Sequence, residues 1–504
     1  MILYQFLCLS TLAFFLISPL SALAQHEHHN MNGHNAARED SLKKQKKQHE
    51  LHAMSAGKMP HTMHGSFYGN FSMSRDGSGT SWLPDSSPME AMHAQKGKWA
   101  FMAHGALFPR YNMQDAFDSG SRGASQFDIP SWFMVMGQRT LGENSQLMLR
   151  AMVTPEPFSV GNDGYPLLFQ TGEALDGSPL IDTQHPHDLF AELSIAVRHT
   201  LSERTAMFAY FGLPGEPALG PTAFMHRPSA RHIPGPPIAH HWQDATHITF
   251  GVATLGLQYD IFKIDGSLFT GREPNEERYG FDKPRFDSYS FRISMNPSEA
   301  LALQFSPAEL EPDIDIRRTT ASLIYNKPLQ NGNWSTALVW GVNKPLGEVV
   351  EIEEEHHDDD HDDEDHHDEG AAGATRIAGL SHVNKINHGA INSTQHSFLL
   401  ESDLKLGKQA FFSRFEIVEK ATVDLALSLA DKDELTLGML TVGTGRELFE
   451  LGSFKGMLGA QATFYRVPEA VQPDYGSNPI SIEIFLRLSP LEVLHSGGHH
   501  GMAH

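Results

Sequence analysis

Apolar and polar residues alternate with a period of two along most of the chain, from about residue 97 to residue 489. Between residues 480 and 488 the even positions are isoleucine or leucine, whereas the odd positions include Glu483 and Arg487. The same alternation recurs in 188–197, 288–295 and 397–406. A period of two predicts β-strands that have one apolar and one polar face.

We predict about sixteen such strands. Their lengths suit a tilted crossing of a bilayer, which takes about 9–11 residues. They cover residues 98–108, 128–140, 145–155, 188–201, 204–213, 246–258, 260–271, 287–296, 300–308, 316–327, 332–343, 395–406, 409–420, 433–444, 454–466 and 480–489.

The connections between these strands fall into two kinds. Short turns follow most even-numbered strands, whereas long loops follow most odd-numbered ones, notably 156–187, 214–245 and 344–394. Outer-membrane barrels segregate their connections in this way, and they close because an open sheet edge would leave backbone groups unpaired in lipid. We therefore predict an all-β fold, a closed antiparallel transmembrane β-barrel of about 16 strands (roughly 14–18). The alternative is a soluble all-β protein whose sheets each have one wet face.

The polar faces of the predicted strands would line the lumen of such a barrel. Their charged residues are Glu192, Arg198, Lys263, Asp265, Arg292, Arg318, Glu401, Asp403, Glu483 and Arg487. Charges of both signs can line an aqueous pore or pair with one another to close it, and the sequence leaves both outcomes open.

The first 24 residues form an apolar stretch that ends in Ala22-Leu23-Ala24, which predicts a signal peptide cut before Gln25. An uncleaved anchor is the alternative, because the usual positive residues are missing. Cys8 is the one cysteine, so the mature chain would have none, which excludes a disulfide scaffold and a thiolate metal site. No later run of about 18 apolar residues predicts a transmembrane helix.

Composition divides the rest of the chain. Residues 25–96 are polar and rich in His and Met, and we expect a largely disordered periplasmic segment that is too short and too polar to fold as a plug. Residues 97–489 form the barrel, and 490–504 are a His-containing tail. The net charge of -23 argues against nucleic-acid binding, which requires a basic surface.

The segment before the barrel carries candidate metal ligands. They are His28, His29, Met31, His61, Met63 and His64. Imidazole suits Cu(II), Zn and Ni, whereas thioether sulfur selects Cu(I), so the mixture points to copper more than to zinc. The alternative is a polar tail whose histidines bind metal only incidentally.

The longest predicted external loop contains the run 351–369, which has thirteen acidic residues and five histidines. Blocks of like charge repel one another and stay disordered. The run either gathers divalent cations weakly at the mouth of the barrel or is a solvated low-complexity insertion.

Four polar motifs lie apart in sequence, but they share one external rim if the fourth to seventh strands are neighbours. We expect His185, His187, His240 and His241 to be metal ligands, with His226 and His247 as further candidates. We expect Asp188, Asp244 and Glu273 to orient the imidazoles. Arg227 and Arg272 are candidates for binding an anion. The alternative is that these groups only hold the long loops together.

Several segments resemble a family of bacterial envelope proteins of uncharacterised activity that is associated with copper or heavy-metal resistance. They are GTSWLPDSSPMEAMH, TQHPHDLFAEL, HHWQDATHITFGV and GREPNEERYGFD, and the likeness runs from about Gly79 to Pro328. The Met/His-rich leader before a barrel is also distantly similar to copper-resistance outer-membrane barrels, although the dense Met-His-Gly-Met repeats of those proteins are missing.

These patterns predict an outer-membrane barrel that binds transition-metal ions, copper first, and serves metal resistance or transport. Its partners would be outer-membrane lipid, the metal ions and periplasmic metal-handling proteins. The alternative is a general porin-like diffusion channel with incidental histidines. A barrel-based surface hydrolase is less favoured, because no Ser/His/acid spacing marks a nucleophile.

Overall fold

The computed structural model describes residues 65–172, 174–176, 178–311, 316–346, 393–427 and 434–491. The predicted signal peptide, the six leader ligands up to His64, the acidic run 351–369 and most of the tail 490–504 lie outside these residues. None of the helices in the described ranges is long and apolar enough to cross a membrane.

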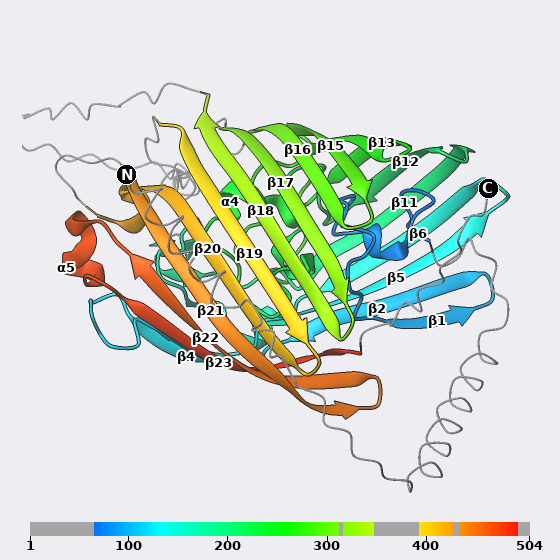
Figure 1. The fold of residues 1–504 in the computed structure, drawn as a ribbon. Coiled ribbons are helices and arrows are strands. Elements are labelled where there is room, and N and C mark those ends of the chain that lie inside the picture. The colour runs from blue at the N-terminus through cyan, green and yellow to red at the C-terminus, as the bar shows by residue number, and fades with distance from the viewer. Residues whose placement is uncertain are drawn as a thin grey trace, which may run out of the picture. The chain divides into compact units, whose positions relative to one another are not determined.

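Sixteen antiparallel strands form a closed transmembrane barrel, as the alternation predicts (Figure 1). Each of the first two is interrupted once, so that β2 (Trp99–Leu107) continues as β3 (Arg110–Gln114), and β4 (Ala124–Asp128) continues as β5 (Ser131–Leu141). The other fourteen are β6 (Ser145–Val153), β11 (Phe190–Ser202), β12 (Thr205–Gly212), β13 (Val252–Tyr259), β14 (Phe262–Phe269), β15 (Ser288–Ser298), β16 (Leu301–Leu310), β17 (Ile316–Leu329), β18 (Gly332–Pro345), β19 (Gln395–Leu406), β20 (Gln409–Ala421), β21 (Glu434–Leu451), β22 (Phe454–Arg466) and β23 (Ile480–Pro490).

The barrel closes where its last strand meets its first. Strand β23 pairs with β3, with Phe485 opposite Arg110, and with β2, with Leu488 opposite Leu107. Beyond that point β1 (Met92–Lys96) pairs with the beginning of β2 as a hairpin.

The remaining elements are short and lie outside the barrel strands. They are η2 (Met73–Arg75), α3 (Glu156–Ser159), β7 (Tyr165–Pro166), β8 (Ala174–Leu175), β9 (Ser178–Pro179), β10 (Thr183–Gln184), η3 (Phe224–His226), α4 (His240–Gln243), η4 (Ala245–His247), η6 (Val423–Leu425), η7 (Glu469–Val471) and α5 (Gln472–Tyr475).

Strand β14 shows how the two faces of the sheet differ. Lys263 and Asp265 point inward and are 0% and 1% exposed, whereas Ile264 and Leu268 between and beyond them are 54% and 56% exposed. Exposed apolar side chains of this kind recur around the barrel, for example Phe291, Leu400 and Ile484. A continuous outward apolar surface needs acyl chains around it, which is the arrangement of a transmembrane barrel.

Two segments fill the inside of the barrel. The plug segment, residues 65–91, precedes β1, and the inner loop, residues 213–251, joins β12 to β13. Phe67 and Tyr68 of the plug segment and Ala218 of the inner loop are fully buried. Helix α4 of the inner loop contacts β17, β18 and β19, and Figure 1 shows it behind β18.

The structure corrects two of the predicted boundaries and one stretch of the predicted alternation. The polar segment predicted up to residue 96 ends as a packed plug from residue 65 onward, because its aromatic and apolar side chains find a wall to pack against. The strand predicted from residue 246 begins at Val252, after η4. In β11 a register shift between Phe190 and Glu192 turns Ala191 inward, so the predicted alternation fails at that point.

Candidate functional site

The lumen of the barrel is lined by buried charges. All ten of the predicted lumen residues, from Glu192 to Arg487, are less than 9% exposed. Sequence reasoning missed seven others in the barrel strands that are equally buried: Arg110, Asp128, Arg150, Arg414, Glu416, Lys420 and Lys455. In a water-filled pore such charges would be accessible to water. The structure therefore favours the second alternative, in which the charges pair with one another and with the segments inside the barrel.

The plug segment is held in the lumen by polar contacts to the wall. The Thr80 hydroxyl donates to Asp265 at 2.5 Å and accepts from Arg292 Nη2 at 2.6 Å, and Lys263 Nζ donates to the Thr80 carbonyl. Arg150 Nη2 donates to the Gly79 carbonyl at 2.6 Å. These wall charges also pair with one another, as Arg292 does with Asp265 at 2.8 Å, and the carbonyls and hydroxyls of the plug supply further hydrogen bonds to them.

Gly79 also marks the place where the plug segment meets the inner loop. Its backbone has φ of +53°, and a Cβ there would lie 2.8 Å from the Cβ of Glu216. Close by, the hydroxyls of Ser81 and Thr222 are 2.8 Å apart. The two inner segments thus contact each other as well as the wall, and glycine is required where they approach most closely.

The inner loop is anchored by an ion-pair network around Arg227. Its guanidinium donates to Glu401 at 2.9 and 3.2 Å and to Asp244 at 2.8 Å, and Arg414 donates to Glu401 at 2.9 Å. The predicted role of Arg227 in binding an anion is therefore wrong, because its donors face protein carboxylates inside the barrel. Arg272, the other anion candidate, lies 3.3 Å from Asp282.

The histidines predicted in and just after the loops 156–187 and 214–245 do come together. The ring centroids are 5.7 Å apart between His185 and His187, 5.3 Å between His187 and His247, and 5.0 Å between His240 and His247. His241 follows His240 at 5.5 Å. We call these five residues the histidine row. His187, His240 and His247 are buried, so the row lies inside the barrel mouth and not on an exposed rim, because the inner loop folds inward.

Three rings of the row are oriented through their Nδ1 atoms. His240 Nδ1 lies 2.7 Å from Asp244, as predicted, and His187 Nδ1 lies 2.8 Å from Glu156. His247 Nδ1 lies 2.8 Å from the Asp244 carbonyl oxygen. A carboxylate or carbonyl on one ring nitrogen fixes the ring and leaves the other nitrogen directed elsewhere.

Burial and neighbouring charges set the protonation of these rings. Burial lowers the pKa of His240 and His247, and the attraction of Asp244 only partly offsets this. Burial also lowers the pKa of His187, but the Glu156 carboxylate outweighs it, so the net pKa is raised. The row therefore combines neutral imidazoles with one that Glu156 holds protonated more readily.

The row does not form a ready metal site. Within the described ranges, no three His, Asp or Glu side chains are placed to hold one metal ion. Glu273 lies 3.6 Å from His241 Nε2, and Asp188 lies 3.8 Å from Arg278, while its negative charge helps to raise the pKa of His187. Glu156 is the orienting residue that sequence reasoning missed, although its position just after the third strand placed it at the same end of the barrel.

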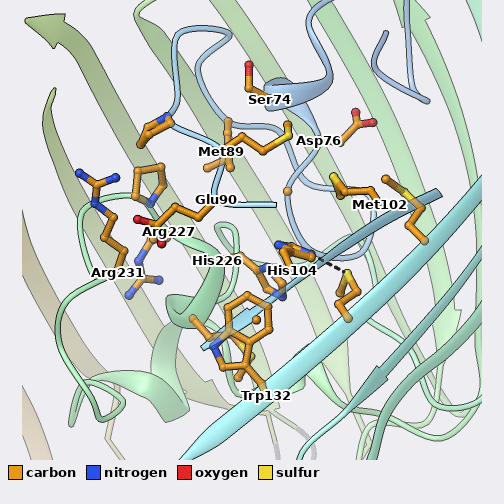
Figure 2. Close-up of a pocket in the computed structure, with 18 of the residues that line it drawn as sticks. Ser74, Asp76, Met89, Glu90, Met102, His104, Trp132, His226, Arg227 and Arg231 are labelled. Carbon is orange, nitrogen blue, oxygen red and sulfur yellow. Dashed lines mark hydrogen bonds between the residues drawn. The ribbon is translucent and has the colours of Figure 1, made fainter. Parts of the chain in front are cut away.

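His226, the sixth histidine proposed as a ligand in this part of the chain, lies apart from the row beside a cavity. This cavity, of about 110 Å³, lies between the plug segment, the inner loop and strands β2, β5 and β6. His226 and His104 are 5.4 Å apart between ring centroids, and Trp132 is 4.6 Å from His226 (Figure 2). Six methionines line the same cavity: Met73, Met89, Met102, Met134, Met136 and Met225.

The signal for this cavity is present in the sequence. Trp132, Met134 and Met136 occupy alternate positions of β5 and so share its inward face, and Met102 and His104 do the same in β2. Sequence reasoning missed them because methionine counts as apolar, and where both faces of a strand are apolar the alternation does not show which face points inward.

Glu216 gives the contact between the inner segments a pH dependence. Burial raises the pKa of Glu216 to about 8, against smaller opposing effects of Ser78 and Arg292. If the plug segment and inner loop separate, water reaches this carboxyl and its pKa returns toward 4.5. The closed state then holds the proton more tightly, so its stability is full below about pH 4.5 and is lost as the pH rises toward 8.

Replacing Glu216 by glutamine, E216Q, is therefore expected to flatten this dependence. Between pH 6 and 8.5 the wild type should lose about 2 kcal/mol of closed-state stability through Glu216, and E216Q should lose none of that part. Hydrogen exchange of the plug-segment amides at the two pH values, corrected for the intrinsic pH dependence of exchange, measures it. His187 acts in the same direction, but it is present in both proteins. An equal rise of the corrected exchange rate in both would contradict the assignment.

No family model matches the sequence, and no curated protein matches it either. Solved structures of similar fold include an anion-selective porin from Comamonas acidovorans, with 9% identity and a TM-score of 0.42 over 78% of this chain and 99% of that one. OmpF of Salmonella typhi has 5% identity and a TM-score of 0.45, over 79% and 100%. OccAB4 of Acinetobacter baumannii has 7% identity and a TM-score of 0.35, over 79% and 99%. Likenesses of this degree carry nothing about solute or activity.

Proposed function

We propose that the protein is an outer-membrane channel for a small solute, whose lumen is kept closed at rest by its own plug segment and inner loop. The observation that carries this proposal is the burial of the lumen charges behind these two segments. In such a barrel the short-turn end faces the periplasm. The plug segment precedes the first strand, which begins at that end.

The contacts that hold the plug segment against the wall are of a kind that water can replace. Wall residues such as Lys263, Asp265 and Arg292 meet hydroxyl and carbonyl groups of the plug, and water can replace these partners one for one. Separation of the inner segments then exposes a charged wall to water, which costs far less than exposing an apolar one. A 16-stranded barrel is wide enough to leave an aqueous channel once it is emptied.

A disulfide between the inner segments tests this proposal. The Ser81 and Thr222 oxygens are 2.8 Å apart, so cysteines at both positions are close enough to be joined. We expect wild-type protein in planar bilayers to pass ions in transient openings, the oxidised S81C/T222C variant to stay closed, and reductant to restore the openings.

The single variant S81C is the matched control, because it carries one introduced thiol and cannot form the bridge. If the oxidised double variant conducts as the wild type does, passage does not require these segments to separate. The proposed closure would then be wrong.

A transition-metal ion, copper first, is the second candidate for the solute. What favours it is the histidine row, in which the buried Nε2 atoms of His187 and His247 have no hydrogen-bond partner among the described residues. Imidazole nitrogen binds Cu(II) and other borderline ions, and ring movement would be needed to bring three donors to one ion. Cu(II) binding that is equal in wild type and in H187Q/H247Q would contradict this candidate.

A further inference from the structure

The cavity beside His226 is unusually rich in methionine. Six of its 21 lining residues are methionine, in a chain that has 20 methionines among 504 residues. The six come from the plug segment, from the inward faces of β2 and β5, and from the inner loop. Four separate parts of the chain therefore place thioether sulfur around one space of about 110 Å³.

Two imidazoles lie at the same cavity. His104 Nε2 is 3.2 Å from the sulfur of Met134, which Figure 2 marks with a dashed line. Two ligands of one metal ion, at about 2.0 Å for nitrogen and about 2.3 Å for sulfur, are at most about 4.3 Å apart. The Nε2 atom of His226 is buried and has no hydrogen-bond partner among the described residues. The unpaired Nε2 of His226 and the close pair of His104 Nε2 and Met134 sulfur are suitable ligands for a small cation.

The charged residues around the cavity leave room for a cation. Arg150 pairs with Glu192 at 2.8 Å, and Arg487 pairs with Glu90 at 2.5 Å. Arg227 is held by Glu401 and Asp244 as described above. Arg231, the fourth arginine of the lining, pairs with Asp403 at 3.1 Å, so each guanidinium group is matched by a carboxylate. The cavity is also lined by Asp76 and Glu90, whose negative charge favours a cation beside the thioethers and imidazoles. Neutral sulfur donors of this kind bind soft ions and discriminate against Mg²⁺, Ca²⁺ and Na⁺.

We infer that this methionine–histidine cavity binds a soft monovalent metal ion, of the class of Cu(I) and Ag(I). The inference rests on the proposed function, since it names the class of solute that the closed lumen would hold. It concerns a different place from the histidine row, and a softer ion than the one that imidazoles alone would select.

Silver provides the test, because Ag(I) has the ligand preference of Cu(I) and does not change its oxidation state in buffer. Full-length protein in detergent is incubated with excess Ag(I) and desalted, and the silver bound per barrel is measured. The variant M102L/M134L/M225L removes three thioethers and keeps the side-chain volume. The matched control is M439L/M457L, two buried methionines that do not line the cavity.

We expect the triple variant to bind one silver ion fewer per barrel than the wild type, and the control variant to bind as many as the wild type. Any silver held by the His/Met-rich leader is the same in all three proteins and cancels. Ag(I) should also quench the fluorescence of Trp132, so the difference in quenching between wild type and W132F should vanish in the triple-variant background.

Equal silver content in the wild type and the triple variant would overturn the inference. The channel proposal fails by a separate sign, which is oxidised S81C/T222C conducting like the wild type. If oxidation of S81C/T222C closes the channel but no silver binds in the cavity, the protein is a channel for another solute. If silver binds in the cavity but oxidised and reduced S81C/T222C conduct alike, the metal site is supported and the proposed closure is wrong.

Discussion

Replacing Arg227 by methionine, R227M, is expected to destabilise the folded barrel by about 3–5 kcal/mol. The Arg227 guanidinium is 0% exposed and neutralises both Glu401 and Asp244. The substitution keeps most of the side-chain volume but removes one of the two arginines that pair with Glu401, and it leaves Asp244 with His240 and the backbone N–H of Phe224. Removing one partner of a buried ion pair leaves charge in a low dielectric without compensation, which is why the cost is large.

The position of Arg227 adds a second consequence. It lies in the inner loop, whereas Glu401 is in β19 of the wall, so the lost contacts are those that dock the loop. We expect R227M to release the inner loop and to raise the open probability of the channel as well as lowering its stability.

The midpoint of urea unfolding of the lipid-reconstituted barrel measures the first effect. R317M is the matched control, since Arg317 pairs with Glu309 at 2.5 Å but is 51% exposed. An exposed pair is worth about 1 kcal/mol or less, so the control should hardly move the midpoint. Equal shifts for R227M and R317M would show that the interior network is solvated.

The barrel itself follows from the sequence because its wall separates two solvents. Each strand has acyl chains on one side and polar groups on the other, so every second side chain is constrained, as Lys263, Ile264 and Asp265 illustrate. All sixteen strands and the inward direction of the ten predicted lumen charges are confirmed for this reason. The local failure at Ala191 has the cause expected of a bulge, in which one extra residue shifts the alternation.

What fills the lumen could not be predicted in the same way. The segment 65–91 has no periodicity, and its polar composition fits an exposed tail as well as a plug whose hydroxyls and carbonyls pair with wall charges. The inner loop raises the same difficulty, because its prolines indicate rigidity but not direction. Whether such a segment turns inward depends on contacts such as that between Arg227 and Glu401, which are 174 residues apart.

The candidate sites were predicted in part. Topology alone brought His185, His187, His240 and His247 together, since neighbouring strands carry their loops. The roles of individual residues depended on side-chain directions that sequence does not give. Glu156 contacts His187 Nδ1, which the sequence did not indicate, and His226 lies beside the methionines. Metal binding by the leader and by the histidine row stays a prediction.

Deleting the plug segment, residues 65–91, is expected to convert the protein into an open pore. The deletion removes Thr80 and Glu90, which are partners of Asp265, Arg292, Lys455 and Arg487, and water would hydrate these wall charges instead. The wall strands retain all their backbone pairing, so we expect the barrel to form and to keep its heat-dependent mobility in gel electrophoresis. Conductance should rise by roughly tenfold or more over the wild type, because water would fill the space that the plug segment leaves beside the inner loop in this 16-stranded barrel.

Single-channel conductance of this deletion in planar bilayers is the most direct test of whether the plug segment closes the lumen. The matched control deletes residues 25–64 and keeps the plug segment. We predict large, steady openings for the deletion of 65–91, and rare, brief openings for both the wild type and the control deletion. Steady conductance of similar size in all three proteins would mean that water already fills the lumen, and it would contradict the closure of the lumen by the plug segment.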